Sequence, residues 1–432
     1  MNPGRAWWLG FVALAALVLA LEWLWQGKTY WLYSEGVYLA TARAVGDGAT
    51  LYRDLAAAQP PPLFYLGAAL LEVSDSILWI RGALATVSIV TAALVAIAVW
   101  RLTGHRTASG AAGIASLVLP WTLREHATLT PEPLAAPLLI GAALLAARPR
   151  LAAPAAALGL LAATLKLAFL LPVAAIGVFA AARARFFVAA VVLGLATAAV
   201  WLAIWGQPLI DNLIVAQGET GFQIGILPGH FAQAIWNLAP LVLLAALALS
   251  ARDHARDPAL LRTLAALAGG SLLLVVTFVK EGTYINLIAL IEPVLVPLAA
   301  AGLVWLFSEA VRTAPGRRIV PIAAWASLAL IGLQSLGILL APGNPLVFGN
   351  PFLDAPGRVL SSKGVDLAIA RARACPPGVP YSGEPYFAFV ADRPLPAGQP
   401  DLFIVREAPV HAQLRDEVSR ALPRCPEAPK GG

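Results

Sequence analysis

The stretch FFVAAVVLGLATAAVWLAIW, residues 186–205, contains no ionisable side chain. About 20 apolar residues form a helix long enough to cross the hydrocarbon core of a bilayer, so this stretch predicts a transmembrane helix. The rest of the chain has the same character, because 59% of its 432 residues are hydrophobic and only 12% are charged. Soluble domains carry about 25% charged residues. A soluble fold of this size is therefore excluded, and a polytopic membrane protein is predicted.

Ten further apolar runs bring the expected number of transmembrane helices to about eleven. They cover residues 7–25, 80–102, 107–123, 131–147, 151–165, 167–182, 235–251, 261–279, 283–307 and 318–341. The shorter run 61–73 begins among prolines and ends beside acids, which favours a helix at the membrane surface. We therefore expect an all-α membrane domain over residues 1–341, followed by a soluble domain over residues 342–432.

The basic residues indicate how the chain crosses the membrane. With the N-terminus inside, thirteen arginines lie in inner loops, against about seven basic residues in outer loops. Inner loops of membrane proteins carry this excess, so a cytoplasmic N-terminus and an extracytoplasmic C-terminal domain are predicted, in the plasma (inner) membrane. The outer loops 26–79 and 206–234 are longer than the rest. The net charge of +6 lies mostly in these short loops and gives no indication of nucleic acid binding.

The C-terminal segment has the composition of a small soluble domain. A helical pattern over 361–374, short apolar runs at 387–390 and 402–405, and proline turns predict an α/β fold in which the two short runs are strands. Cys375 and Cys425 both belong to this outer domain. Because that space is oxidising, a disulfide between them is expected, the alternative being two buried free thiols.

Acids beside the apolar runs are the first candidates for chemistry, because charges next to a bilayer are costly. Glu35 follows the first apolar helix, where low dielectric can raise a carboxyl pKa toward that of a general base; the alternative is an acid that favours a helix N-terminus. Glu125, His126 and Glu132 share the next outer turn. Their spacing matches no strong ligand motif, so no metal or other cofactor is predicted, and a divalent metal stays an alternative.

Three more charges stand out near the outer face. Lys166 lies between two apolar runs, where it either extends to the membrane surface or holds an anionic head group. Lys280 belongs to a second outer cationic turn. Glu292 precedes Pro293 inside a predicted span, and a buried acid beside a helix-kinking proline normally faces a polar cavity. Together these charges predict a polar pocket that opens outward beside the bilayer.

Several short segments, in order, resemble the bacterial GT-C glycosyltransferases of the family 39 type, the integral-membrane enzymes that include protein O-mannosyltransferases and aminoarabinose transferases. These segments are Ser34-Glu35-Gly36-Val37-Tyr38, Gly48 with Tyr52-Arg53-Asp54, Pro61-Pro62-Leu63-Phe64-Tyr65, Arg81, Thr130-Pro131-Glu132-Pro133, Thr164-Leu165-Lys166 and the stretch from Lys280 to Pro293. The resemblance covers roughly residues 1–300. It implies transfer of a sugar from a polyprenyl-phosphate carrier to a glycan, lipid or protein acceptor outside the cytoplasm.

The resemblance also implies roles for individual residues. An Asp-Glu pair usually stands where this chain has Ser34-Glu35, and the Asp is the usual base; serine does not accept a proton at neutral pH. The remaining candidates for the catalytic carboxylate are Glu35, Asp54, Glu125 and Glu132. The candidates for binding the donor phosphate are Lys166, Lys280, Arg81 and Arg124. The candidates for lining the substrate pocket are Tyr38, His126, His230, Tyr284 and Glu292.

Two other classes of function stay open. A non-catalytic relative that acts as a scaffold or binds a sugar-lipid is suggested by Ser34. A transporter of lipid-linked substrates would require matching halves with broken helices, and the sequence has no such halves.

Overall fold

The computed structural model describes residues 3–26, 33–282, 285–307, 319–340, 362–376, 378–421 and 425. These residues form helices and loops without a β-strand, and isolated bridges such as that between Phe222 and Lys280 are the nearest approach to a sheet. Tyr284, which the sequence placed in the substrate pocket, lies outside the described residues.

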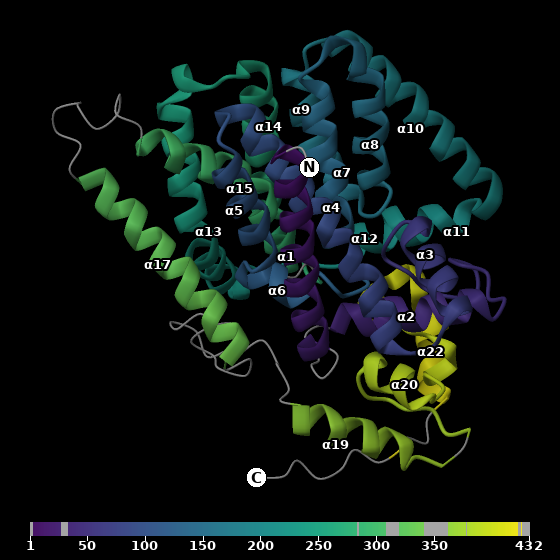
Figure 1. Cartoon of the computed structure of the whole chain (residues 1–432). Helices are drawn as coiled ribbons and strands as arrows, with labels where there is room; N and C mark the ends of the chain where they lie inside the picture. The colour runs from purple at the N-terminus through teal and green to yellow at the C-terminus, as the bar shows by residue number, and fades with distance from the viewer. Residues whose placement is uncertain are drawn as a thin grey trace.

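The main body is a helical bundle whose members follow the apolar runs of the sequence (Figure 1). Its helices are α1 (Pro3–Gln26), α4 (Ile77–Thr103), α5 (Arg106–Leu117), α7 (Pro131–Ala146), α8 (Ala152–Ala163), α9 (Leu170–Phe179), α10 (Arg183–Trp205), α13 (Leu227–Ser250), α14 (Pro258–Leu273), α15 (Ile288–Leu306) and α17 (Ile319–Leu340). By length and composition, the described stretches that can cross a membrane are Ile77–Thr103, Arg183–Trp205, Leu227–Ser250, Pro258–Val279 and Ile285–Leu306. The total of about eleven spans stays a prediction.

Burial distinguishes the centre of the bundle from its edge. Helix α15 packs against α13, α4, α14 and α7, and 83% of its most apolar window is buried. In contrast, none of the corresponding window of α10 is buried, and this helix lies at the edge of the bundle in Figure 1. Large apolar side chains exposed along a whole helix need an apolar partner. This exposure fits the prediction that residues 186–205 face lipid.

Short elements gather at one end of the bundle. The helices there are α2 (Tyr33–Gly46), α3 (Pro61–Val73), α6 (Pro120–Glu125), α11 (Gln207–Ile210) and α12 (Ala216–Glu219). A π-helical turn, η3 (Asp211–Val215), joins the last two. The 3₁₀ turns of the chain are η1 (Pro149–Leu151), η2 (Leu167–Phe169), η4 (Ile224–Ile226), η5 (Arg252–His254), η6 (Leu274–Val279), η7 (Ile285–Leu287), η8 (Pro396–Gly398) and η9 (Pro409–His411).

The C-terminal segment is helical, so the predicted α/β fold is wrong for its described part. It consists of α19 (Ser362–Arg373), α20 (Pro385–Ala391), α21 (Leu402–Glu407) and α22 (Ala412–Arg420). The two runs expected to be strands lie within α20 and α21. Pro385 opens α20, and the Asp401 side chain accepts a hydrogen bond from the Ile404 backbone N–H to begin α21. Short apolar runs fit a strand or a helix equally by pattern alone, and these local start signals favoured the helix.

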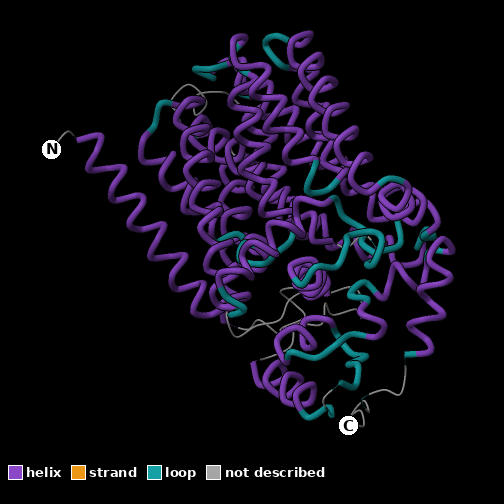
Figure 2. The backbone as a smooth tube through the Cα atoms, turned by 90° about the vertical axis from the view of Figure 1, so that its right-hand side faces the viewer, coloured by secondary structure: helices purple, strands orange, loops and turns teal. Residues whose placement is uncertain are grey.

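This segment, called the tail below, packs directly on the end of the bundle that carries α2 and α12, called the outer end below after the predicted topology (Figure 2). Arg43 donates to the Phe389 carbonyl at 3.0 Å and lies 3.9 Å from the centre of its ring. Gln399 forms two hydrogen bonds with the backbone of the loop before α3, to Ala56 N at 2.9 Å and Asp54 O at 2.8 Å. Gly36 contacts the Tyr386 backbone so closely that any Cβ would lie 2.2 Å from its nitrogen. The tail and the first outer loop therefore form one packed unit.

Cys375 and Cys425 are joined by a disulfide, as the topology predicted. It closes a loop with a sequence separation of 50 residues that contains α20, α21 and α22. Replacing both cysteines by serine removes this constraint on the unfolded tail. In the chain-entropy model, the tail then loses about 4 kcal/mol of stability. Hydrogen exchange of the tail amides is expected to accelerate while that of α4 and α15 is unchanged; equal protection in both proteins would contradict the prediction.

Candidate functional site

A buried ion pair joins α2 to α4 at the outer end of the bundle. The Arg81 guanidinium donates from Nε to Glu35 Oε1 at 2.9 Å and from Nη2 to Oε2 at 2.6 Å. Both side chains are completely buried. The tail covers the pair, because the Arg81 guanidinium lies 5.4 Å from the centre of the Tyr386 ring. Both carboxylate oxygens of Glu35 are thus bound by the Arg81 guanidinium.

The next outer turn holds a second group of buried charges. Glu125 ends α6 with its carboxylate fully buried, and Arg124 Nε lies 3.8 Å from Glu125 Oε1. The Arg124 guanidinium also lies 4.4 Å from the centre of the Trp121 ring. Burial raises the pKa of Glu125 well above its usual range. The charges of Glu132, Lys166 and Glu35 also affect the pKa of Glu125. Glu35, Glu125 and Glu132 therefore form one cluster.

Lys166 and Glu132 form the third charged pair of this cluster. Lys166 Nζ donates to Glu132 Oε1 at 2.7 Å; the acid is fully buried and 16% of the lysine side chain is exposed. The lysine lies between α8 and η2, at the point where the bundle ends. Its ammonium is therefore fixed by a buried carboxylate while one side of it still reaches open space.

That space is a pocket between the bundle and the tail, called the outer pocket below. It has about 740 Å³ of empty volume, part of which is open to solvent. The residues that line it are Tyr33, Ser34, Val37, Tyr38, Ala58, Gln59, Lys166, Gln217, Thr220, Glu281, Gly282, Asn286, Asp401, Phe403 and Ile404. The lining combines aromatic rings and side-chain amides with one lysine and two carboxylates. Such a mixed polar and apolar lining is typical of ligand sites.

The structure brings some of the predicted site residues to the outer pocket and leaves others outside it. Tyr38 and Lys166 line it, together with Ser34. Asp54 lies on the surface, where hydrogen bonds from Thr50 and Arg53 lower its pKa. Lys280 lies beside the pocket, donates to the Thr220 carbonyl and contacts the Phe222 ring.

Most residues that line the pocket were missed by the sequence analysis, among them Asp401 and Asn286. Asp401 comes from the tail, and Asn286 from η7. Asn286 is 3% exposed, and its Oδ1 has no hydrogen-bond partner. An aspartate directly before the run 402–405 was a signal for a helix start, but no sequence pattern indicated that the tail would fold over the bundle.

Three other candidates lie outside the lining of the outer pocket. Glu292 Oε2 accepts from the backbone N–H groups of Trp121 at 2.9 Å and Thr122 at 3.0 Å. It therefore holds the start of α6 in place and does not line the outer pocket. His230 packs on the Phe278 ring with ring centres 5.8 Å apart, also away from that pocket.

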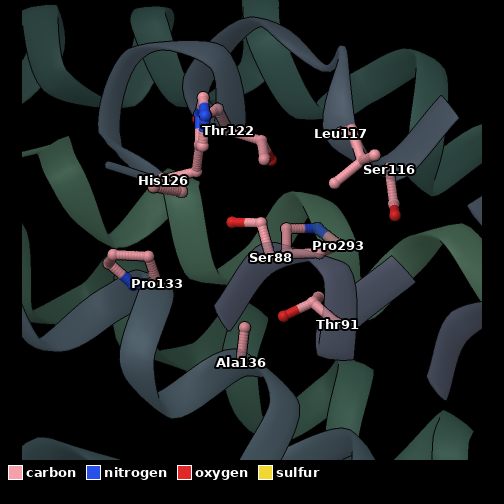
Figure 3. Close-up of a pocket in the computed structure, with 10 residues that line it drawn as sticks. Ser88, Thr91, Ser116, Leu117, Thr122, His126, Pro133, Ala136 and Pro293 are labelled. Atoms are coloured by element: carbon pink, nitrogen blue, oxygen red, sulfur yellow. The ribbon is translucent and has the colours of Figure 1, made fainter. Parts of the chain in front are cut away.

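A second, inner cavity borders the third of them, His126 (Figure 3). It has about 290 Å³ of empty volume. Ser116 and Thr91 line it, but their hydroxyls donate to carbonyls of their own helices, at 2.7 and 3.3 Å. Burial lowers the pKa of His126 to about 4, so its ring is neutral at neutral pH. The outer pocket, in contrast, brings a lysine and two carboxylates together, which makes it the candidate ligand site.

Within the described residues, no group of three or more His, Cys, Asp and Glu side chains is placed to hold a metal ion. The acids of the cluster are instead divided among separate cationic partners, Glu35 with Arg81 and Glu132 with Lys166.

The buried pair between Glu35 and Arg81 makes a prediction about stability. Arg81→Met leaves an uncompensated carboxylate in the interior and is expected to cost about 3–5 kcal/mol. The double variant Glu35→Leu with Arg81→Met removes both charges and is expected to recover most of that loss. Thermal unfolding in detergent micelles measures both, and a double variant no more stable than Arg81→Met would contradict the prediction.

No protein-family model matches the chain, and no curated protein matches it in sequence. Among solved structures, ArnT from Cupriavidus metallidurans, crystallised bound to undecaprenyl phosphate, is similar with a TM-score of 0.59. The match covers 90% of this chain and 85% of ArnT at 17% sequence identity. A likeness at this identity concerns the fold. The chain therefore shares the fold of ArnT over most of its length.

Proposed function

We propose that this protein is a glycosyltransferase that moves a sugar from a polyprenyl-phosphate donor to an acceptor outside the cytoplasm. The observation that carries the proposal is Lys166 in the wall of the outer pocket, on the fold of an enzyme that was solved with a polyprenyl phosphate. A pocket at the end of the bundle suits a donor whose tail stays in lipid while its sugar enters a polar space.

Lys166 is well placed to bind the donor phosphate. An ammonium has three N–H donors, and the Glu132 bond at 2.7 Å uses one of them. Because the leaving phosphate gains negative charge during transfer, a cation fixed beforehand stabilises the transition state more than the ground state. Arg81 binds Glu35, and Arg124 contacts Glu125 and the Trp121 ring. These two arginines therefore stabilise the buried acids of the cluster.

The reaction would be a single displacement with inversion. An acceptor hydroxyl attacks the anomeric carbon, its proton passes to a carboxylate, and the polyprenyl phosphate leaves with the electron pair of the broken bond. No metal or other cofactor is needed for this scheme.

One observation favours a second candidate, a non-catalytic protein that binds a sugar-lipid. Position 34, where the resemblance places the base, lines the pocket but carries serine, while Glu35 is held by Arg81. A protein without a base would still bind the donor through Lys166. The two candidates therefore differ in turnover and agree on binding.

Lys166→Gln tests the proposal, because glutamine can still donate to Glu132 but carries no charge. Because the buried Glu132 carboxylate then lacks its counter-charge, the variant is expected to unfold at a lower temperature than the wild type. At a temperature where it stays folded, it is expected to lose about 100-fold or more in sugar transfer. Transfer is measured from radiolabelled undecaprenyl-phosphate sugars to a membrane extract by the purified protein. Lys280→Gln, outside the pocket lining, is the matched control and should lose much less. Full activity of Lys166→Gln would contradict its role, and donor binding without transfer by the wild type would favour the non-catalytic candidate.

A further inference from the structure

Among the described residues that line the outer pocket, the acids are Glu281 and Asp401. The acids that the sequence analysis favoured are held elsewhere. Glu35 binds Arg81, and Glu132 binds Lys166. Glu125 is fully buried beside Arg124, and Asp54 lies on the surface. A general base must reach the proton that it accepts, so the search for the base narrows to the two lining acids.

The two acids differ in their surroundings. Glu281 accepts from the Gln223 side chain at 2.6 Å and follows Lys280 in an outer turn, so its charge is already balanced by neighbours. Asp401 is only 8% exposed, and its carboxylate accepts from the backbone N–H groups of Phe403 and Ile404. These bonds fix the side chain at the start of α21 without supplying a counter-charge.

Asp401 lines the same pocket as Tyr38 and Lys166. Tyr38 lines the same space, and burial together with the charges of Glu132 and Asp401 raises the pKa of its hydroxyl. Lys166 lines it as well. The bundle thus contributes Lys166, a cation for the phosphate, to the pocket. The tail contributes Asp401, a carboxylate for the acceptor proton, to the same pocket.

We infer that Asp401 of the tail is the general base of the proposed transfer. The inference rests on the proposed function, and it identifies the carboxylate to which the acceptor proton passes. The acceptor O–H proton moves to Asp401, the acceptor oxygen forms a bond to the anomeric carbon, and the bond from that carbon to the phosphate oxygen breaks. The electron pair of the broken bond leaves on the polyprenyl phosphate, which Lys166 faces.

Burial supports this role. It raises the pKa of Asp401 to about 6, although the two backbone hydrogen bonds act in the opposite direction. A base works best when its pKa lies near the working pH. A carboxyl group with a pKa near 6 is ionised at neutral pH and accepts a proton more readily than an exposed one.

Asp401 also caps α21, so its variants must separate the cap from the base. Asparagine caps helices as well as aspartate does, but it does not accept a proton from the acceptor. Glutamate keeps the carboxylate and is a poor cap. A base therefore predicts more activity in Asp401→Glu than in Asp401→Asn, whereas a residue that only caps predicts the reverse order.

The experiment uses the full chain in lipid nanodiscs, with radiolabelled undecaprenyl-phosphate mannose and undecaprenyl-phosphate aminoarabinose as donors and a bacterial membrane extract as acceptor. Asp401→Asn is expected to keep the unfolding temperature and the affinity for undecaprenyl phosphate, and to lose about 100-fold or more in turnover. Asp401→Glu is expected to retain part of the turnover. Glu281→Gln tests the other lining acid and is expected to lose much less turnover than Asp401→Asn.

The possible results distinguish failure of the proposed function from failure of the assignment of Asp401 as the base. A wild type that transfers neither sugar overturns the proposed function, and the base with it. An active wild type with an equally active Asp401→Asn overturns only the assignment of Asp401. Loss of turnover in Glu281→Gln, with Asp401→Asn active, makes Glu281 the base and is equally fatal to the inference.

Discussion

The outer half of the molecule depends on the buried pair between Glu35 and Arg81. Two full charges with no exposure to water are stable only while they hold each other, so α2 and α4 have one relative position that satisfies both. That position also determines where the tail packs. Tyr386 of the tail covers the pair, and the absence of a side chain at Gly36 lets the tail backbone approach α2. Ser34 and Tyr38, on the same turns of α2 as Glu35, then face the pocket.

The pocket is therefore built from parts that have no local reason to meet. The bundle contributes Lys166 with Glu132 behind it, and the tail contributes Asp401 and Phe403. Gln399 fixes the tail to the loop before α3 through backbone hydrogen bonds. Hydrogen bonds to backbone atoms depend on the conformation of the loop and not on its side chains. The sequence of the loop therefore did not indicate that Gln399 binds it.

The sequence predicted the bundle well, because bilayer crossing imposes a length and a composition that are visible in each segment separately. It also predicted the disulfide, since topology placed both cysteines in an oxidising space. It placed Glu35 correctly beside low dielectric, but its partner lies 46 residues further along the chain. For the same reason Glu292 was expected in a polar cavity, whereas it holds the start of α6. The error in the tail had a different source, the ambiguity of short apolar runs such as 402–405.

The use of the tail as a pocket wall has a consequence for how the protein matures. Lys166 and Ser34 belong to segments that enter the membrane early in synthesis, whereas Asp401 and Phe403 follow the last bundle helix, α17. The outer pocket is thus incomplete until the tail has docked on the loop before α3. Because Asp401 and Phe403 are synthesised after all the bundle helices, closing the pocket is the last step in the assembly of the described fold.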